Sequence, residues 1–444
     1  MTKTVYSNKE IWKIAYPTLI SLVMEQMISM TDTAFLGRVG EVELGASAIA
    51  GVYYMAIFMM GFGFTVGAQI IMARRNGEKN YTEIGKVFYH GLYFLLCLAV
   101  VAFTLSKLIS PSLLKNIVHS HEIYEAAISY IDWRIFGFFF SFSAALFRAF
   151  YIATTHTKTL TLNSIVMVLS NIFFNYILIF GHFGLPALGI AGAAIGSSLA
   201  ELVSLIFFIT YTSRRIDCAK FGLNRFVRFR MQSLRNILSV SIWTMIQNFV
   251  SLSTWFMFFL FVEHLGKHAL AITNVVRSIS GLTFMVIVAF SSTCGSLVSN
   301  LIGAGKTEYV RPTIWQHVKL TYAFVLVIAG IFALFPHAIL SIYTNIPSVL
   351  HDAVPSLWVL CTSYLIIVPA NVYFISVSGT GNTRMAFILE TSALVIYVAY
   401  MSFIIGYLKL DVAWCWTSEH VYGLFIFLFC YFYIRSGRWK GKVI

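Results

Sequence analysis

The sequence predicts an all-α integral membrane protein with twelve transmembrane helices in two six-helix lobes, related by a pseudo-twofold axis along the membrane normal. Of its 444 residues, 59% are hydrophobic and 11% are charged, and the mean hydropathy is +0.80. Soluble domains carry about 25% charged residues. Apolar runs of about 20 residues, long enough for a helix to cross a bilayer, recur along the whole chain. Strands of a membrane barrel would be about half as long and would alternate in polarity.

Short polar connections separate these runs and leave no stretch for a separate soluble domain. The first run follows a polar N-terminus and has no small-residue cleavage site behind it, so we expect a retained helix and not a signal peptide. We predict spans at residues 11–36, 47–73, 84–108, 123–153, 159–181, 189–214, 235–262, 268–301, 312–335, 348–376, 384–406 and 413–435.

The distribution of basic residues predicts the orientation. Of 31 Lys and Arg residues, 22 lie at the N-terminus, the even-to-odd connections and the C-terminus, whereas 5 lie at the opposite connections and 4 lie within spans. Cytoplasmic connections of membrane proteins are enriched in Lys and Arg. We therefore expect a multi-pass protein of the plasma membrane (the bacterial inner membrane) with both termini in the cytoplasm.

The densest basic segment, residues 213–232, reads SRRIDCAKFGLNRFVRFRMQ and interleaves Arg with Phe221, Phe226 and Phe229. Such a stretch could bind RNA, but next to a membrane it favours an interfacial segment on anionic headgroups. Its position divides the chain into two halves of six spans. The expected parts are an N-lobe over 1–214, a basic cytoplasmic linker over 215–234 and a C-lobe over 235–444.

The two halves repeat at a fixed shift of 226 residues. This shift aligns identical residues in spans and in glycine-containing loops: Phe35 with Phe261, Gly40 with Gly266, Leu44 with Leu270, Phe58 with Phe284, Gly77 with Gly303, Ala144 with Ala370 and Thr157 with Thr383. Six spans return the chain to its starting side, so the copies are parallel repeats. Two such lobes are typical of an alternating-access transporter.

Of the 18 carboxylates, four lie well inside the spans: Glu25, Asp32, Glu201 and Glu390. Each costs a few kcal/mol or more at membrane depth, so each should face the bundle interior and a partner. Depth along the spans predicts which residues are neighbours. Asp32 lies at the level of Asn175, and Asn171 lies one turn deeper on the same face.

Glu25 and Glu201 lie deeper, near mid-membrane, with Ser197 and Ser198 one turn above Glu201. Both acids could be structural partners of Arg148, and this reading is level with a role in coupling or substrate binding. Glu390 lies alone near the inner end of its span, which favours a structural role.

A carboxylate surrounded by amide and hydroxyl oxygens suits Na⁺, which needs oxygen ligands in place of its hydration shell. The same carboxylate in a dry pocket can instead carry a proton, so composition does not separate Na⁺ from H⁺. We therefore predict a cation site, with Na⁺ as its possible metal, at Asp32, Asn171 and Asn175. For the two asparagines, hydrogen bonding between helices is an equally good interpretation. Further candidates for coupling or substrate binding are Glu25, Glu201, Ser197 and Arg148.

Five segments together resemble the multidrug and toxic compound extrusion (MATE) family, in its prokaryotic type. They are IAYPTLISLVMEQMISMTDTAFLGRVG, GFGFTVGAQIIMARRNGEKN, NIFFNYILIFG, LGIAGAAIGSSLAE and SGTGNTR, in this order. The resemblance covers essentially the whole chain. It implies antiport, in which Na⁺ or H⁺ running inward drives an organic, often cationic and amphipathic compound outward. It also implies that Asp32, Asn171 and Asn175 form the cation site of the N-lobe, although one branch of the family has an acid in place of Asn175.

The second half departs from this family pattern. Many members carry acids in spans 7 and 10, where this chain has Ser251 and Ile367. We therefore expect no cation site in the C-lobe. Shifting Ser251 by the repeat length leads to Glu25, and we hypothesise that Glu25 takes over part of the role of the missing acid.

Three other functions compete with the efflux transporter. A related flippase for lipid-linked or polysaccharide substrates should line its cavity with several cations, but only Arg134, Arg148, Arg277 and Lys319 are intramembrane. Another twelve-span superfamily would carry a Gly/Asp/Arg loop between spans 2 and 3, where ARRNGEKN stands. A membrane enzyme would need clustered His or paired acids at one depth, and we predict no enzyme.

The expected partners are a small-molecule substrate and the lipid bilayer, without nucleic acid, and the expected state is a monomer. The six cysteines have no paired spacing, and no phosphate-binding Gly-Lys-Ser/Thr loop occurs. We predict no cofactor besides the coupling ion, Na⁺ or H⁺.

Overall fold

The computed structural model describes residues 5–118, 120–344 and 346–442, and all regular structure within these ranges is helical. The first half contains α1 (Asn8–Val39), α2 (Glu41–Gly77), α3 (Tyr81–Ile117), α4 (His121–Arg134), α5 (Gly137–Ala153), α6 (Lys158–Phe180) and α7 (Gly189–Arg215). The second half contains α8 (Met231–Glu263), α9 (Lys267–Gly303), η1 (Thr307–Tyr309), α10 (Val310–Leu334), α11 (Pro336–Leu340), α12 (Pro347–Gly379), α13 (Thr383–Met401), the π-helical η2 (Ser402–Tyr407), α14 (Val412–Trp416) and α15 (Ser418–Ser436).

Ten helical segments in the described ranges are long and apolar enough to cross a membrane. The pair α4 and α5 adds an eleventh, because the two helices pass the same test together. The 32-residue helix α1 has the length of a span but a less apolar composition, in which Glu25 and Asp32 take part. The twelve predicted spans each correspond to a helix or a broken helix, and the all-α membrane fold is confirmed.

The fourth predicted span is not one straight helix. It bends by 52° between α4 and α5, at Ile135 and Phe136. No proline lies at the bend. Gly137 follows it, and a Cβ at this position would clash with the side chains of Arg134 and Glu201. The bend therefore brings backbone against a buried pair of charged side chains.

The chain forms two compact units, Ile20–Met245 and Met1–Leu19 together with Ile246–Ile444. These bounds differ from the expected lobes and linker, because the first part of α1 joins the second-half helices and the first part of α8 joins the first-half helices. The three-part division over 1–214, 215–234 and 235–444 stays a prediction. Residues 1–4 and 443–444, at the outer ends of that division, lie outside the described residues.

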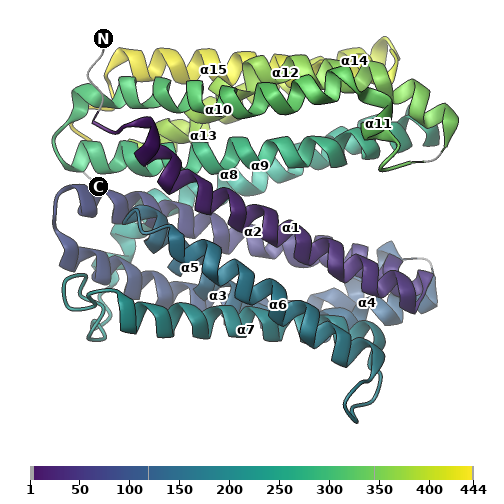
Figure 1. Ribbon diagram of the computed structural model, residues 1–444, viewed down its shortest axis with the longest axis horizontal. Helices are drawn as coiled ribbons and strands as arrows, with labels where there is room; N and C mark the ends of the chain where they lie inside the picture. Colours follow the sequence, from purple (N-terminus) through teal and green to yellow (C-terminus); the bar gives the residue numbers. More distant parts are fainter. Residues whose placement is uncertain (1–4, 119, 345, 443–444) are drawn as a thin grey trace. The chain divides into compact units, whose positions relative to one another are not determined.

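In the unit Ile20–Met245, α2 packs on α3, α4 and α5, and α6 runs beside α7 (Figure 1). Small residues allow close approach, as is usual between membrane helices. A Cβ on Gly63 of α2 would lie 2.7 Å from the Cα of Met245 and 2.9 Å from the carbonyl oxygen of Thr244. This contact holds the first part of α8 against α2.

In the other unit, α12 packs against α9, α10 and α15 (Figure 1). The start of α1 joins this unit through Trp12, whose ring stacks on Phe324 with centroids 4.7 Å apart. A capping box begins α1: the Ser7 backbone N–H donates to Glu10 Oε2 at 2.7 Å, and the Glu10 N–H donates to Ser7 Oγ at 3.2 Å. The helix therefore starts at a defined position before it continues into the first span.

Candidate cation site and buried ion pairs

Three helices bring the side chains around Asp32 together. Asp32 projects from α1, Asn171 and Asn175 lie one turn apart on α6, and Ser197 lies on α7. Asn175 Nδ2 donates to Asp32 Oδ1 at 2.5 Å, and Ser197 Oγ donates to Asp32 Oδ2 at 3.1 Å. Asn171 closes the set, because its Oδ1 accepts from Asn175 Nδ2 at 3.3 Å and its Nδ2 donates to Ser197 Oγ at 3.2 Å. Asp32, Asn171 and Asn175, which were expected to be neighbours, thus form one hydrogen-bonded cluster, and Ser197, which was expected beside Glu201, joins them.

This cluster is buried and has one unused acceptor. Asn171 and Asn175 are fully buried, whereas Asp32 is partly exposed. Asn175 Oδ1 has no hydrogen-bond partner. It faces Gly196 of α7, where a Cβ would clash with it. An unsatisfied oxygen beside a carboxylate costs free energy unless a cation or donor joins it, so the cluster has the chemistry of a cation site.

Ser198 lies outside the cluster. Its Oγ donates to the carbonyl oxygen of Trp133 at 3.4 Å. In the described ranges, no group of three His, Cys, Asp or Glu side chains forms a metal site. The candidate set for a hard cation therefore consists of one carboxylate, two amides and one hydroxyl.

Glu201 forms a bidentate ion pair with Arg134 of α4. Arg134 Nη2 donates to Glu201 Oε1 at 2.6 Å, and Nη1 donates to Oε2 at 2.9 Å. The two side chains are 11% and 9% exposed. Tyr54 of α2 covers the pair, with the guanidinium carbon 3.8 Å from its ring centroid and its hydroxyl 3.3 Å from Glu201 Oε2. The alternative in which Arg148 is the structural partner of Glu201 is wrong, because Glu201 pairs with Arg134.

Arg148 pairs instead with Glu25, as the alternative structural reading predicted for this acid. Its guanidinium contacts the Glu25 carboxylate directly and also donates to Ser21 Oγ at 2.8 Å. Ser21 in turn shares a hydrogen bond of 2.7 Å with Ser164 of α6. The Glu25 side chain is 39% exposed, so this acid is balanced by a cation but remains within reach of other molecules.

The prediction that Glu390 lies alone is wrong. Its Oε1 accepts hydrogen bonds from Ser251 Oγ at 2.7 Å and from the Tyr422 hydroxyl at 3.3 Å, and the residue is 4% exposed. Ser251 is the position where related proteins were expected to carry an acid. In this chain an acid from α13 reaches the same place, and no ion pair with a described Lys, Arg or His accompanies it.

Sequence reasoning missed Arg134, Tyr54 and Tyr422 as members of these clusters. Arg134 carried a signal, since it is one of four intramembrane cations. Tyr54 and Tyr422 carried none, because Tyr is frequent throughout the chain, with 23 copies.

Comparison with known proteins identifies the family of this chain. The MatE family model matches the chain twice, over residues 17–177 and over 244–403. The chain belongs to the multidrug and toxic compound extrusion (MATE) family. The second match repeats the first at nearly the shift found in the sequence, which supports the duplication. The assignment of the protein as a MATE efflux transporter rests on the two family-model matches and not on any single cluster of side chains.

Relatives of similar length span almost all of this MATE chain. It is 23% identical over 442 residues to a probable multidrug resistance protein NorM of Thermotoga maritima, covering 98% of this chain and 94% of that one. It is 22% identical over 450 residues to a probable multidrug resistance protein YoeA of Bacillus subtilis, covering 99% and 96%.

Solved structures share the fold. An outward-facing multidrug resistance MATE transporter of the MOP superfamily superimposes with a TM-score of 0.89 at 18% identity, covering 98% of this chain and 97% of that one. A MOP superfamily transporter from Pyrococcus furiosus, for which reversed polarity of the binding pocket suggests a different function, gives a TM-score of 0.86 at 18% identity, covering 96% of both chains.

Proposed function

We propose that this MATE transporter exports organic, cationic amphipathic compounds in exchange for Na⁺ or H⁺ by alternating access. The observation that carries the proposal is the hydrogen-bonded cluster of Asp32, Asn171, Asn175 and Ser197. It places one carboxylate among amide and hydroxyl groups, with the Asn175 oxygen free to accept. Binding of either ion neutralises Asp32, which is the change in charge that a coupled transporter needs.

Each ion would use the cluster differently. Na⁺ would be held by oxygens of Asp32, Asn171, Asn175 and Ser197, and the unpartnered Asn175 Oδ1 supports this use. H⁺ would reside on Asp32 itself, with the amide and hydroxyl groups holding the acid in place. Both uses require Asp32, so its removal tests coupling whichever ion is involved.

The substrate class rests on the relatives and on composition. Two relatives that span nearly the whole chain are named as probable multidrug resistance proteins. The chain has 40 Phe, 23 Tyr and 15 Met residues, which are side chains that recognise shape and hydrophobicity loosely. The positive charge of the substrate rests on the family resemblance, because the partly exposed Glu25 is already paired with Arg148.

A flippase for lipid-linked or polysaccharide substrates is the alternative. It would need intramembrane cations that are free to bind an anionic substrate. Of the four such cations, Arg134 and Arg148 are engaged with Glu201 and Glu25. Arg277 and Lys319 form no ion pair in the described ranges, so fewer cations are left than the several that such a cavity should hold, which favours efflux of cations.

The family is one of membrane transporters, which favours the transporter over a membrane enzyme. A bacterial inner-membrane location with both termini in the cytoplasm rests on the Lys and Arg distribution, and a monomeric state is proposed with it.

The test is transport by the purified protein in liposomes. Efflux of a fluorescent cationic dye is followed under an imposed Na⁺ or H⁺ gradient for the wild type, Asp32→Asn and the control Asp132→Asn, which changes an exposed acid on α4. We expect gradient-driven efflux that is lost with Asp32→Asn and kept with Asp132→Asn, and the effective gradient names the ion. Equal transport by wild type and Asp32→Asn would contradict the coupling role of Asp32.

A further inference from the structure

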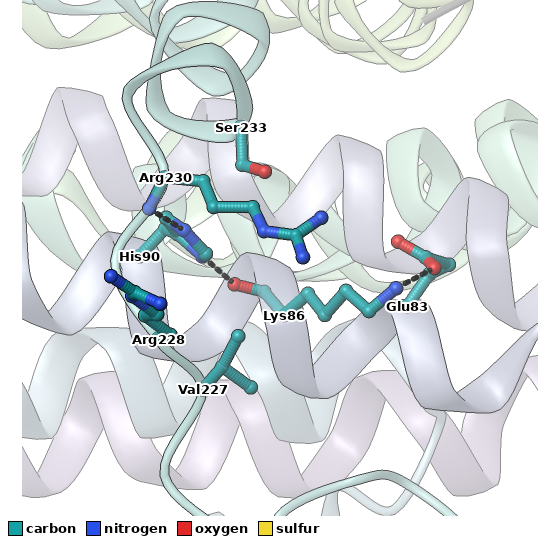
Figure 2. Close-up of a pocket in the computed structure, with 7 residues that line it drawn as sticks. All are labelled: Glu83, Lys86, His90, Val227, Arg228, Arg230 and Ser233. Atoms are coloured by element: carbon teal, nitrogen blue, oxygen red, sulfur yellow. Dashed lines mark hydrogen bonds and ion pairs between the residues drawn. The ribbon is translucent and has the colours of Figure 1, made fainter.

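A small basic pocket lies where the start of α3 meets the segment before α8. Its cavity of about 200 Å³ is lined by Glu83, Lys86, His90, Val227, Arg228, Arg230 and Ser233 (Figure 2). Pockets for drug-sized ligands usually measure about 300 to 1,000 Å³, so this one suits a smaller group. It is separate from the Asp32 cluster in sequence and uses none of its residues.

Hydrogen bonds between α3 and the segment 216–230 define the walls of this pocket. Residues 216–230 form no helix, but side chains of α3 bind their backbone. The Tyr89 hydroxyl donates to the carbonyl oxygen of Leu223 at 2.7 Å, and the Tyr93 hydroxyl donates to that of Val227 at 2.9 Å. These hydrogen bonds fix the course of the segment along α3.

His90 provides a third side chain of α3 that binds the backbone of this segment. It is 1% exposed, and its Nε2 accepts from the Arg230 backbone N–H at 3.0 Å, while Nδ1 faces the carbonyl oxygen of Lys86 at 2.7 Å (Figure 2). Because an N–H only donates and a carbonyl only accepts, the ring is neutral with its proton on Nδ1. His90 thereby holds the backbone of Arg230 next to that of Lys86.

The charges in the pocket do not cancel. Lys86 forms an ion pair with Glu83 at 2.5 Å, which balances one positive charge. Arg228 and Arg230 are exposed, and neither pairs with an acid in the described ranges. Figure 2 shows the Arg230 guanidinium and the Lys86 ammonium group on the same side of the cavity. Two uncompensated cations among the residues that line one small cavity indicate an anionic ligand.

Exposed apolar side chains beside the pocket indicate where the anion comes from. Phe226 is 82% exposed, Met231 is 66% exposed and Phe229 is 47% exposed. They alternate with the arginines along the chain. At a membrane surface, such side chains enter the acyl boundary while neighbouring arginines contact headgroups. A free phosphate ion would leave these apolar side chains in water.

We propose that this pocket binds the phosphate group of an anionic phospholipid through Arg228, Arg230 and Lys86. The apolar side chains of Phe226, Phe229 and Met231 then lie among the lipid tails. The bound headgroup ties the segment before α8 to the bilayer surface. The site is additional to the transport function and does not depend on which ion or substrate is moved.

The test is lipid binding by the full-length protein in detergent, with retained lipids counted by native mass spectrometry. The probes are phosphatidylglycerol, phosphatidylcholine and inorganic phosphate. Arg228→Gln/Arg230→Gln removes the two uncompensated cations, and Arg214→Gln/Arg215→Gln makes the same charge change at exposed positions on α7, outside the pocket. Thermal unfolding of each variant checks that the fold is kept.

We expect the wild type to prefer phosphatidylglycerol over phosphatidylcholine. The pocket variant should bind phosphatidylglycerol about 30-fold more weakly, the loss for two cations near an anionic surface, while the control variant keeps most of its affinity. Glu83→Gln should tighten binding several-fold, because it frees Lys86 from its ion pair. This gain cannot result from misfolding, so it keeps the test decisive if the double variant is unstable.

Three results would overturn the proposal. Equal binding of phosphatidylglycerol by the wild type and the pocket variant would show that the lipid does not bind through Arg228 and Arg230. Equal losses of affinity for phosphatidylglycerol in the pocket and control variants would show that the lipid responds to the general surface charge and not to this pocket. Displacement of phosphatidylglycerol by inorganic phosphate at comparable concentration would assign the pocket to free phosphate and not to a lipid.

Discussion

Removing the carboxylate of Glu201 should destabilise the protein far more than removing an exposed acid. Glu201 and Arg134 are nearly buried and bind through two hydrogen bonds of 2.6 and 2.9 Å. In Glu201→Gln the Arg134 charge stays buried without its counter-charge. Such a loss costs about 3 to 5 kcal/mol, because the cation keeps its desolvation cost and loses the attraction that offset it.

The assay is thermal unfolding of the purified protein in detergent, followed by circular dichroism. At roughly 2 to 4 °C per kcal/mol for a unit of this size, Glu201→Gln should lower the Tm by roughly 6 to 20 °C. The matched control is Asp132→Asn. It breaks the Lys107 ion pair of 2.7 Å, whose side chains are 39% and 45% exposed, and pairs of that kind contribute about 0 to 1 kcal/mol.

A double variant separates the pair from its single members. Arg134→Met/Glu201→Met replaces both charges by apolar side chains, which is often neutral for buried pairs, so it should recover most of the loss in Tm. The reasoning is refuted if Glu201→Gln lowers the Tm no more than Asp132→Asn does. It is also refuted if the double variant lowers the Tm by the sum of the decreases that Arg134→Met and Glu201→Met each cause alone.

Three further variants or conditions test other parts of the structure. Gly137→Ala should lower the Tm about as much as Glu201→Gln, because the added methyl group clashes with both members of the pair, and an unchanged Tm would show that the α4–α5 bend adapts freely. Glu25→Gln should lower dye efflux in liposomes several-fold without changing which ion drives it, whereas wild-type efflux would leave Glu25 as a structural partner of Arg148 alone. Hydrogen bonds from Ser7 hold the pKa of Glu10 below its usual value, so the capping contribution is present above the ordinary Glu pKa and is lost as the pH falls through the lowered one. The protection factors of the amides at the start of α1, which correct for the pH dependence of intrinsic exchange, should fall over that range, and constant protection factors would count against the capping box.

Helical periodicity and depth were enough to predict that Asn171 and Asn175 lie near Asp32, but they placed Ser197 beside Glu201 instead. Asn171 and Asn175 are four residues apart and must share a face of one helix, and the outer end of that helix gives their level in the membrane. The side chains do meet in the structure. Their role in binding a coupling ion stays a prediction, because hydrogen bonding between helices would produce the same contacts.

Depth alone could not choose between neighbours on different helices. Arg134 and Arg148 both lie in the fourth predicted span, and nothing in the sequence shows that a 52° bend directs them to different acids. Proline usually marks such a bend, and here Gly137 is the only local sign. Glu390 was misjudged for a related reason, since Ser251 is neutral and did not stand out as its partner.

The bounds of the two compact units have a consequence for the history of the chain. A cut in the 215–230 segment would divide the chain into its two halves of six spans. Yet the first half would keep residues 8–19, whose packing partners such as Phe324 are in the second, and the second half would keep residues 231–245, which pack on α2. Because each compact unit contains a helix end from the other half of the chain, each half depends on the other to complete its packing. The fusion of the duplicated genes is therefore hard to reverse, and separately expressed halves should fold only when they are produced together.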